Sequence, residues 1–177
     1  FFQIGDLNSN IVIQGIAFDD GLKFFKYSEN VIFDDISVTG SEMAVQNSNS
    51  VTIRNSDFMN IYPEVSSYAG NEWNTHGDRE QGLYVGKLEG LLLEGNFFDH
   101  NGCAPDYLDS ASTNGGIPPS QWSHNIYIAN DVFDITLRDS IMMRGASFGA
   151  QVRTGGFIED NLFLDNNAQF QTMGGDY

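Results

Sequence analysis

The feature that most constrains the fold of this chain is an apolar pair, with its members five residues apart, that recurs six times. The pairs are Ile13/Phe18, Phe33/Val38, Ile53/Phe58, Leu93/Phe98, Leu137/Met142 and Ile158/Phe163. Successive pairs are separated by 20, 20, 40, 44 and 21 residues, which indicates a structural repeat of about 20 residues. A repeat of this regularity predicts a stack of similar units.

The residues that directly follow the first member of each pair form a second series. From Asp34 onward, the charge in this series alternates in sign. This series reads Gln14, Asp34, Arg54, Glu94, Arg138 and Glu159. If the repeats stack in register, opposite charges lie next to each other in one column. Exposed ion pairs contribute only about 0–1 kcal/mol each, so we expect this charge ladder to fix register more than stability. It also assigns Arg54 and Arg138 to structure.

Each repeat contains two short segments in which apolar residues flank an outward one, the pattern of a half-buried strand. The first segment is found at 43–45, 83–85, 126–128 and 150–152, and the second at 11–13, 31–33, 51–53, 91–93 and 135–137. Turn-forming residues separate the segments, helical periodicity is nearly absent, and the leucine-rich-repeat pattern is missing. The sequence therefore predicts an all-β fold, a single-stranded parallel β-helix of about six rungs.

The composition is consistent with one folded domain over residues 1–177. Hydrophobic residues make up 41% of the chain and include 14 Phe, which argues against disorder. No apolar run approaches the roughly 20 residues of a membrane span. The formal net charge of −16, with only eight Lys and Arg, argues against nucleic acid as a partner. The single cysteine, Cys103, excludes an intramolecular disulfide.

Three segments resemble rungs of the right-handed parallel β-helix superfamily, the pectate-lyase-like group that includes polysaccharide lyases and C5-epimerases. They are Asn30–Ile36, Asn49–Phe58 and Ser123–Ile128. The resemblance implies a right-handed coil, an extracellular or cell-surface location, and a polysaccharide as partner. The residue sets that mark polygalacturonases and alginate epimerases are absent, so no family within the superfamily is identified.

Members of that superfamily usually carry an N-terminal cap and more rungs than six. The chain begins with Phe-Phe, and its first rung starts almost at residue 1. We therefore expect a section of a longer β-helix protein. Uncapped rungs leave strand edges open, so we also expect contacts with further rungs or with other chains at the two ends.

Two insertions, at about 60–80 and 101–123, enlarge consecutive repeats at the same corner of the coil. Long loops on a rigid scaffold often carry function. The three histidines lie in or beside these insertions, and histidine is the natural general base near neutral pH. We interpret His76 and His124 as candidate bases and His100 as a turn residue.

These residues match the requirements of β-elimination on a uronate sugar, which needs a cation for the carboxylate, a base for the C5 proton and an acid for the leaving oxygen. The sequence thus favours a lyase or C5-epimerase acting on a uronate-containing polysaccharide. The candidate catalytic residues are His124, His76, Tyr127, Arg79 and Arg153. The candidate substrate-binding residues are Tyr84, Trp73, Trp122, Arg144, Gln151 and Lys87.

An acidic polymer conflicts with the acidity of the chain unless positive charge is gathered at the site. We expect the cations to cluster around the groove, or Ca²⁺ to bridge protein and polymer; the cations concerned are Arg79, Arg144, Arg153 and Lys87. No His or Cys spacing predicts a built-in metal site.

Two alternatives remain open. Glycoside hydrolysis needs two carboxylates about 5–5.5 Å or 6.5–9.5 Å apart, and the insertions offer several. These are Asp78, Glu80, Asp99, Asp106 and Asp109. In a non-catalytic glycan-binding or structural rod, similar to a tailspike or an adhesin, Trp73 and Trp122 would be contact residues. Tyr84 and Tyr127 would then form a stacked pair worth about 0.2–1 kcal/mol.

Overall fold

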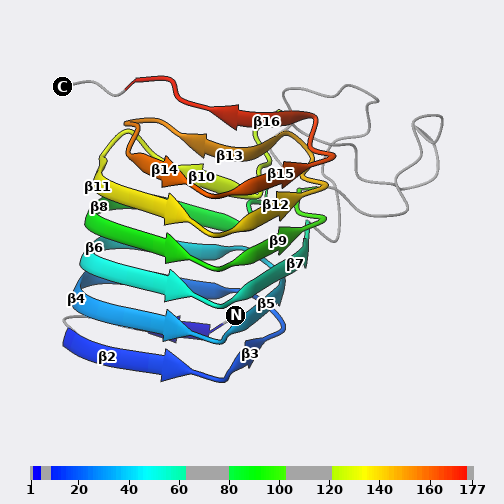
Figure 1. The fold of residues 1–177 in the computed structure, drawn as a ribbon. Coiled ribbons are helices and arrows are strands. Elements are labelled where there is room, and N and C mark those ends of the chain that lie inside the picture. Colours follow the sequence, from blue (N-terminus) through cyan, green and yellow to red (C-terminus); the bar gives the residue numbers. More distant parts are fainter. Residues whose placement is uncertain (1, 5–8, 63–79, 103–120, 175–177) are drawn as a thin grey trace.

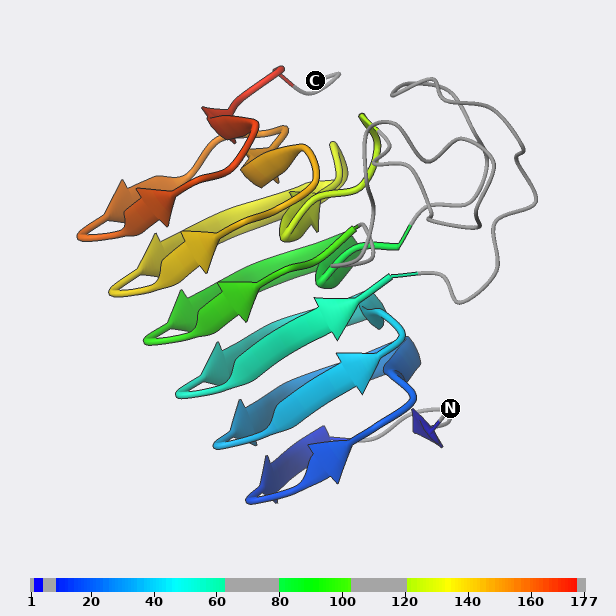
Figure 2. The same ribbon diagram turned by 90° about the vertical axis from the view of Figure 1, so that its right-hand side faces the viewer.

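The fold consists of β-strands in two parallel sheets (Figures 1 and 2). This computed structural model describes residues 2–4, 9–62, 80–102 and 121–174, with the backbone alone for 2–4 and 23–26. These ranges contain no helix, and so none that could cross a membrane. The ten-stranded sheet comprises β1 (Phe2–Ile4), β2 (Ser9–Gln14), β4 (Leu22–Asp34), β6 (Met43–Arg54), β8 (Leu83–Glu94), β10 (Ile126–Ile128), β11 (Val132–Arg138), β13 (Phe148–Val152), β14 (Phe157–Glu159) and β16 (Ala168–Gln171). The six-stranded sheet comprises β3 (Ala17–Phe18), β5 (Ser37–Gly40), β7 (Asp57–Ile61), β9 (Phe97–Asp99), β12 (Ile141–Met143) and β15 (Leu162–Leu164).

The strands pair in parallel with the equivalent strand of the next repeat. Phe33 of β4 lies beside Ile53 of β6, and Ile53 in turn lies beside Leu93 of β8. The chain therefore returns to the same place after about 20 residues, or about 40 where an insertion intervenes, as the spacing predicts. In Figure 1 the repeats form a stack, with β2 and β3 at one end and β15 and β16 at the other.

The charge ladder forms in the predicted order. Pairing in the ten-stranded sheet aligns Gln14, Asp34, Arg54, Glu94, Arg138 and Glu159. Arg54 Nη2 lies 2.9 Å from Asp34 Oδ2, and Arg138 Nη2 lies 2.7 Å from Glu94 Oε1. Arg138 also approaches Glu159 at 4.0 Å. Each arginine thus sits between acidic neighbours, because a parallel in-register sheet repeats every column along the stack.

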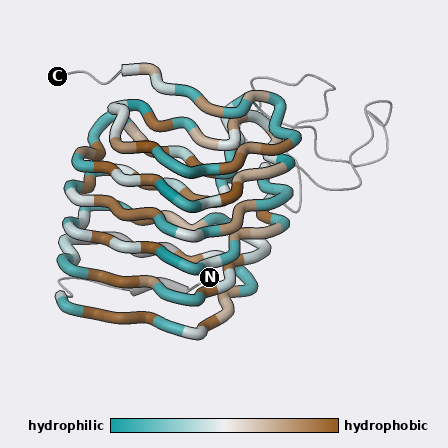
Figure 3. The backbone as a smooth tube through the Cα atoms, viewed as in Figure 1, coloured by the Kyte–Doolittle hydropathy of each residue, from teal (hydrophilic) through white to brown (hydrophobic). Residues whose placement is uncertain are grey.

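The second members of the apolar pairs form one continuous core column. Phe18, Val38, Phe58, Phe98 and Met142 are buried, and Phe163 packs against them partly buried. The Phe58 and Phe98 rings stack with their centroids 4.5 Å apart. Burying each such side chain stabilises the fold by about 1.5–3 kcal/mol. The hydropathy colouring in Figure 3 shows apolar segments at the same place in successive repeats.

The structure adds a third strand segment to each repeat, where the sequence pattern indicates two; the two predicted segments are continuous in β4, β6 and β8. The core column lies on strands of its own, in the six-stranded sheet. A residue with positive φ, between 51° and 66°, turns the chain from one sheet to the other; this position holds Gly15, Asp35, Asn55, Gly95, Asp139 and Asp160. Gly, Asn and Asp accept this left-handed conformation most readily. The third strand escapes sequence detection because it has only two to five residues and follows these turn formers directly.

A ladder of buried asparagines holds the corner from which the second insertion leaves the stack. Asn101 Nδ2 donates to Asn125 Oδ1 at 2.9 Å, and Asn125 Nδ2 donates to Asn166 Oδ1 at 3.1 Å. Asn101 Oδ1 also accepts the backbone N–H of Ile61. An amide both donates and accepts, so identical side chains can bond along a stack. Leaving one of them unpaired would cost about 1–3 kcal/mol, so the ladder fixes where the chain departs and where β10 begins.

The charge ladder makes part of the stability pH-dependent. Hydrogen bonds from Arg54 and Asn55 lower the pKa of the Asp34 carboxyl below its ordinary value. The pKa of this carboxyl in the unfolded chain is about 3.9. The stabilisation by these hydrogen bonds is therefore present above that pH, and it is lost as pH falls through the lower pKa of the folded state. We expect Asp34→Asn to flatten the acid limb of a plot of urea midpoint against pH. The exposed Asp19→Asn variant is the control, and an equal flattening there would contradict the assignment.

Candidate functional site

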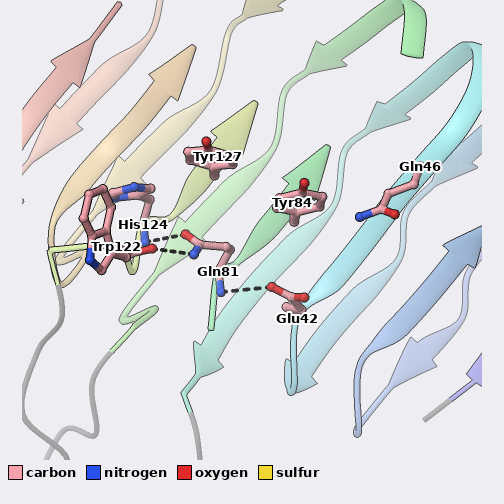
Figure 4. Close-up of a pocket in the computed structure, with 7 residues that line it drawn as sticks. All are labelled: Glu42, Gln46, Gln81, Tyr84, Trp122, His124 and Tyr127. Carbon is pink, nitrogen blue, oxygen red and sulfur yellow. Dashed lines mark hydrogen bonds between the residues drawn. The ribbon is translucent and has the colours of Figure 1, made fainter. Parts of the chain in front are cut away.

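A cleft of about 420 Å³ lies on the outer face of the ten-stranded sheet, where β6, β8 and β10 begin. Figure 4 shows its lining, which comprises Glu42, Gln46, Gln81, Tyr84, Trp122, His124 and Tyr127. Gln81 and Trp122 each lie at the end of an insertion, shortly before the next strand begins. The cleft is therefore built from the places where the two insertions rejoin the stack.

A row of three rings forms one side of the cleft. Register places Tyr84 of β8 beside Tyr127 of β10, and their rings stack at 5.6 Å with an interplanar angle of 12°. The His124 ring stacks on the other face of Tyr127, also at 5.6 Å. Tyr84 lies over Gly86, where an added Cβ would come within 3.2 Å of the phenol oxygen. The expectation that Tyr84 and Tyr127 point outward side by side is confirmed.

His124 lies in the cleft, but its bonding does not favour a general base. Its side chain is almost fully buried, with 1% of the residue exposed. The backbone N–H of Phe148 donates to Nδ1 at 3.4 Å. A nitrogen that accepts this bond carries no proton, so the neutral ring holds its proton on Nε2. In this state His124 can donate from Nε2, whereas taking up a proton at Nδ1 would cost the bond to Phe148.

Gln81 connects the ends of the two insertions. Its buried amide accepts the backbone N–H of His124 at 2.7 Å and donates to the carbonyl of Trp122 at 2.5 Å (Figure 4). On its other side, the Gln81 backbone N–H donates to Glu42 Oε2 at 3.4 Å, and the Glu42 N–H donates to Glu80 Oε2. This hydrogen-bond chain crosses three repeats and sets the position of Trp122.

The expected cluster of cations does not form among the members that the structure describes. The Asp99 carboxylate binds Arg144 through two hydrogen bonds, and this pairing raises the pKa of Arg144. Lys87 has a left-handed backbone conformation within β8, with φ of 50°, and lines a separate hollow of about 340 Å³. Arg153 alone of these three lies beside the aromatic row, with Nη1 3.5 Å from the Tyr127 hydroxyl.

The remaining predicted residues divide between other places in the structure and the undescribed segments. Gln151 is buried beyond Trp122 and donates to Gln171 Oε1. His100 has φ of 53° and lies 3.1 Å from Asp99, which fits its interpretation as a turn residue. Outside the described residues lie Trp73, His76, Asp78, Arg79, Asp106 and Asp109.

Three cleft residues were not predicted from the sequence, namely Glu42, Gln46 and Gln81. Each lies within two residues of a predicted strand segment, and Gln46 aligns with Gly86 in the sheet. Extending the outward columns past the ends of those segments would have found Gln46. Gln81 and Glu42 precede their strands, where no periodic pattern marks them.

The described residues contain no group of three or more His, Cys, Asp or Glu side chains arranged to hold a metal ion. In this part of the chain there is therefore no set of side chains that would bind the Ca²⁺ considered from the sequence. Comparison of the chain with protein-family models, curated proteins and solved structures finds no match. The function has to be inferred from the geometry of the cleft.

Proposed function

We propose that the chain forms a right-handed parallel β-helix of about six rungs that binds a polysaccharide in the cleft over β6, β8 and β10. The parallel pairing, the in-register charge ladder and the continuous core column support the coil. Right-handedness is supported by the strong general preference of parallel crossover connections for that hand. In this proposal residues 1–177 form one domain, located outside the cell or on its surface.

The observation that carries the proposal is the combination of aromatic and uncharged polar groups in one cleft. Tyr84, Tyr127 and the 43%-exposed Trp122 offer apolar surface to the C–H groups of a sugar. The Gln46 amide can donate to and accept from hydroxyls, and the buried Gln81 amide holds the backbone of Trp122 in place. A few polar groups placed in an apolar cleft are typical of small-molecule sites.

The charge of the cleft favours a neutral sugar chain over an acidic one. Among the described residues that line it, Glu42 is the only charged group, and it is negative. The net charge of the whole chain is −16. A polyanion would approach this surface against electrostatic repulsion. A hydroxyl-rich neutral glycan would bind without that penalty.

Trp122 provides the direct test of the binding site. Burying its exposed indole against a sugar ring would contribute about 1.5–3 kcal/mol, so Trp122→Ala should weaken binding tenfold or more. Binding is measured by affinity electrophoresis and calorimetry with neutral and uronate polysaccharides. The control is Phe133→Ala, which removes a 47%-exposed ring that does not line the cleft. Equal losses in both variants, or binding of no polysaccharide, would refute the site.

Gln81 allows a second test, because a glutamate has the same shape. In Gln81→Glu the protonated carboxyl can still donate to Trp122 and accept from His124, whereas the ionised carboxylate cannot donate. Burial raises the pKa of such a carboxyl above its ordinary value of about 4.3. We therefore expect the variant to bind like wild type at low pH and to lose affinity as pH rises through that raised pKa. The ratio of variant to wild-type affinity is measured across pH, and a constant ratio would reject this role of Gln81.

A lyase or C5-epimerase acting on a uronate polymer is the second candidate. The supporting observation is the Tyr127 hydroxyl beside Arg153, since the guanidinium would neutralise a carboxylate while the phenol moves a proton. Elimination creates a conjugated double bond, so ultraviolet absorbance should rise on uronate polymers, and Tyr127→Phe should abolish the rise. New reducing ends without absorbance would instead indicate hydrolysis. If uronate polymers yield neither elimination nor proton exchange at C5, this candidate is rejected.

A further inference from the structure

A second hollow, of about 260 Å³, adjoins the cleft on the outer face of β13 and β16. Trp122 borders both the hollow and the cleft, so the two share a wall. The His124 ring connects them as well, because it stacks on Tyr127 in the cleft and contacts Phe148 of the hollow with centroids 5.3 Å apart. The two spaces therefore form neighbouring parts of one surface.

One outward column runs along this surface through both spaces. Sheet register aligns Tyr84, Tyr127, Gln151 and Gln171. At about 4.8 Å per repeat, the three steps from Tyr84 to Gln171 cover about 14 Å along the stack axis. Aromatic side chains occupy the part of the column in the cleft, and amides occupy the part in the hollow.

The hollow has the chemistry expected for uncharged hydroxyl groups. Its polar side chains are amides and a hydroxyl, including those of Gln121, Gln151, Gln171 and Ser147. No Lys, Arg, Asp or Glu is among its described lining residues. Gln151 is 4% exposed, and its amide nitrogen donates to Gln171 Oε1 and, at 3.0 Å, to Met173 Sδ, so this buried amide orients the two side chains beside it. Phe148 and Met173 add apolar surface.

We propose that the hollow is a second subsite of the polysaccharide-binding cleft, and that both bind one linear neutral glycan chain lying along the stack axis. This inference rests on the proposed function and specifies its ligand. The aromatic row receives the apolar faces of the sugar rings at one end of the chain. The Gln171 amide, which the buried Gln151 amide orients, binds hydroxyls at the other end, and Trp122 contacts the chain where it passes between the subsites.

The proposal is tested with cello-, xylo-, manno- and malto-oligosaccharides from disaccharide to octasaccharide, by calorimetry on the whole chain. Affinity should rise with length until both subsites are filled and should then remain constant. Gln171→Leu removes one hydrogen-bonding amide of the hollow, and should weaken the long ligands about three- to tenfold while leaving disaccharide binding unchanged. Gln46→Leu, in the cleft, is the matched control and should weaken ligands of every length.

The 55%-exposed Met173 provides a second variant, which lies beyond the end of β16 and leaves the Gln151–Gln171 hydrogen bond in place. Met173→Ala should also weaken only the long ligands. The second subsite is overturned if affinity does not depend on length, or if the hollow variants weaken the disaccharide as much as the octasaccharide. The neutral class is overturned if only uronate oligosaccharides bind. If no oligosaccharide binds, the proposed function fails together with this inference.

Discussion

The structure depends on the in-register parallel pairing of successive repeats. In such a stack each residue has the same neighbours above and below as its equivalents, so a favourable contact found once is available in every repeat. The charge ladder, the Phe-rich core column and the asparagine ladder all follow from this constraint. It is also restrictive, because a shift by one residue would turn each buried column outward.

The insertions leave this register unchanged. β7 pairs with β9, and β6 with β8 and β8 with β10, although about 40 residues separate the equivalent positions. The stack therefore acts as a rigid support, and chemistry can vary at the corner where the insertions leave and return. Gln81 illustrates how this corner is organised, since a single amide holds the backbone that follows the second insertion. The cleft exists because that backbone carries Trp122 and His124 to the start of β10.

The distribution of positive charge connects the fold to the proposed ligand. Arg54 and Arg138 pair with acids in the charge ladder, and Arg144 pairs with Asp99 at the end of β12. These structural ion pairs occupy most of the arginines described, and they leave the cleft with amides, rings and a carboxylate. A binding site of this composition suits hydroxyl groups better than carboxylates, which is why a neutral glycan agrees with both the acidity of the chain and the local geometry.

The sequence by itself determined what repeats: the period of about 20 residues, the alternation of charge, the apolar column and the pairing of Tyr84 with Tyr127. The period and the register are enough to predict these features, because each feature consists of contacts between equivalent positions in successive repeats. The tertiary structure decided what does not repeat. The role of Gln81, the ion pair between Arg144 and Asp99 and the position of Lys87 involve residues at unequal positions in different repeats. Their contacts depend on how the chain bends at each corner, and no spacing in the sequence records that.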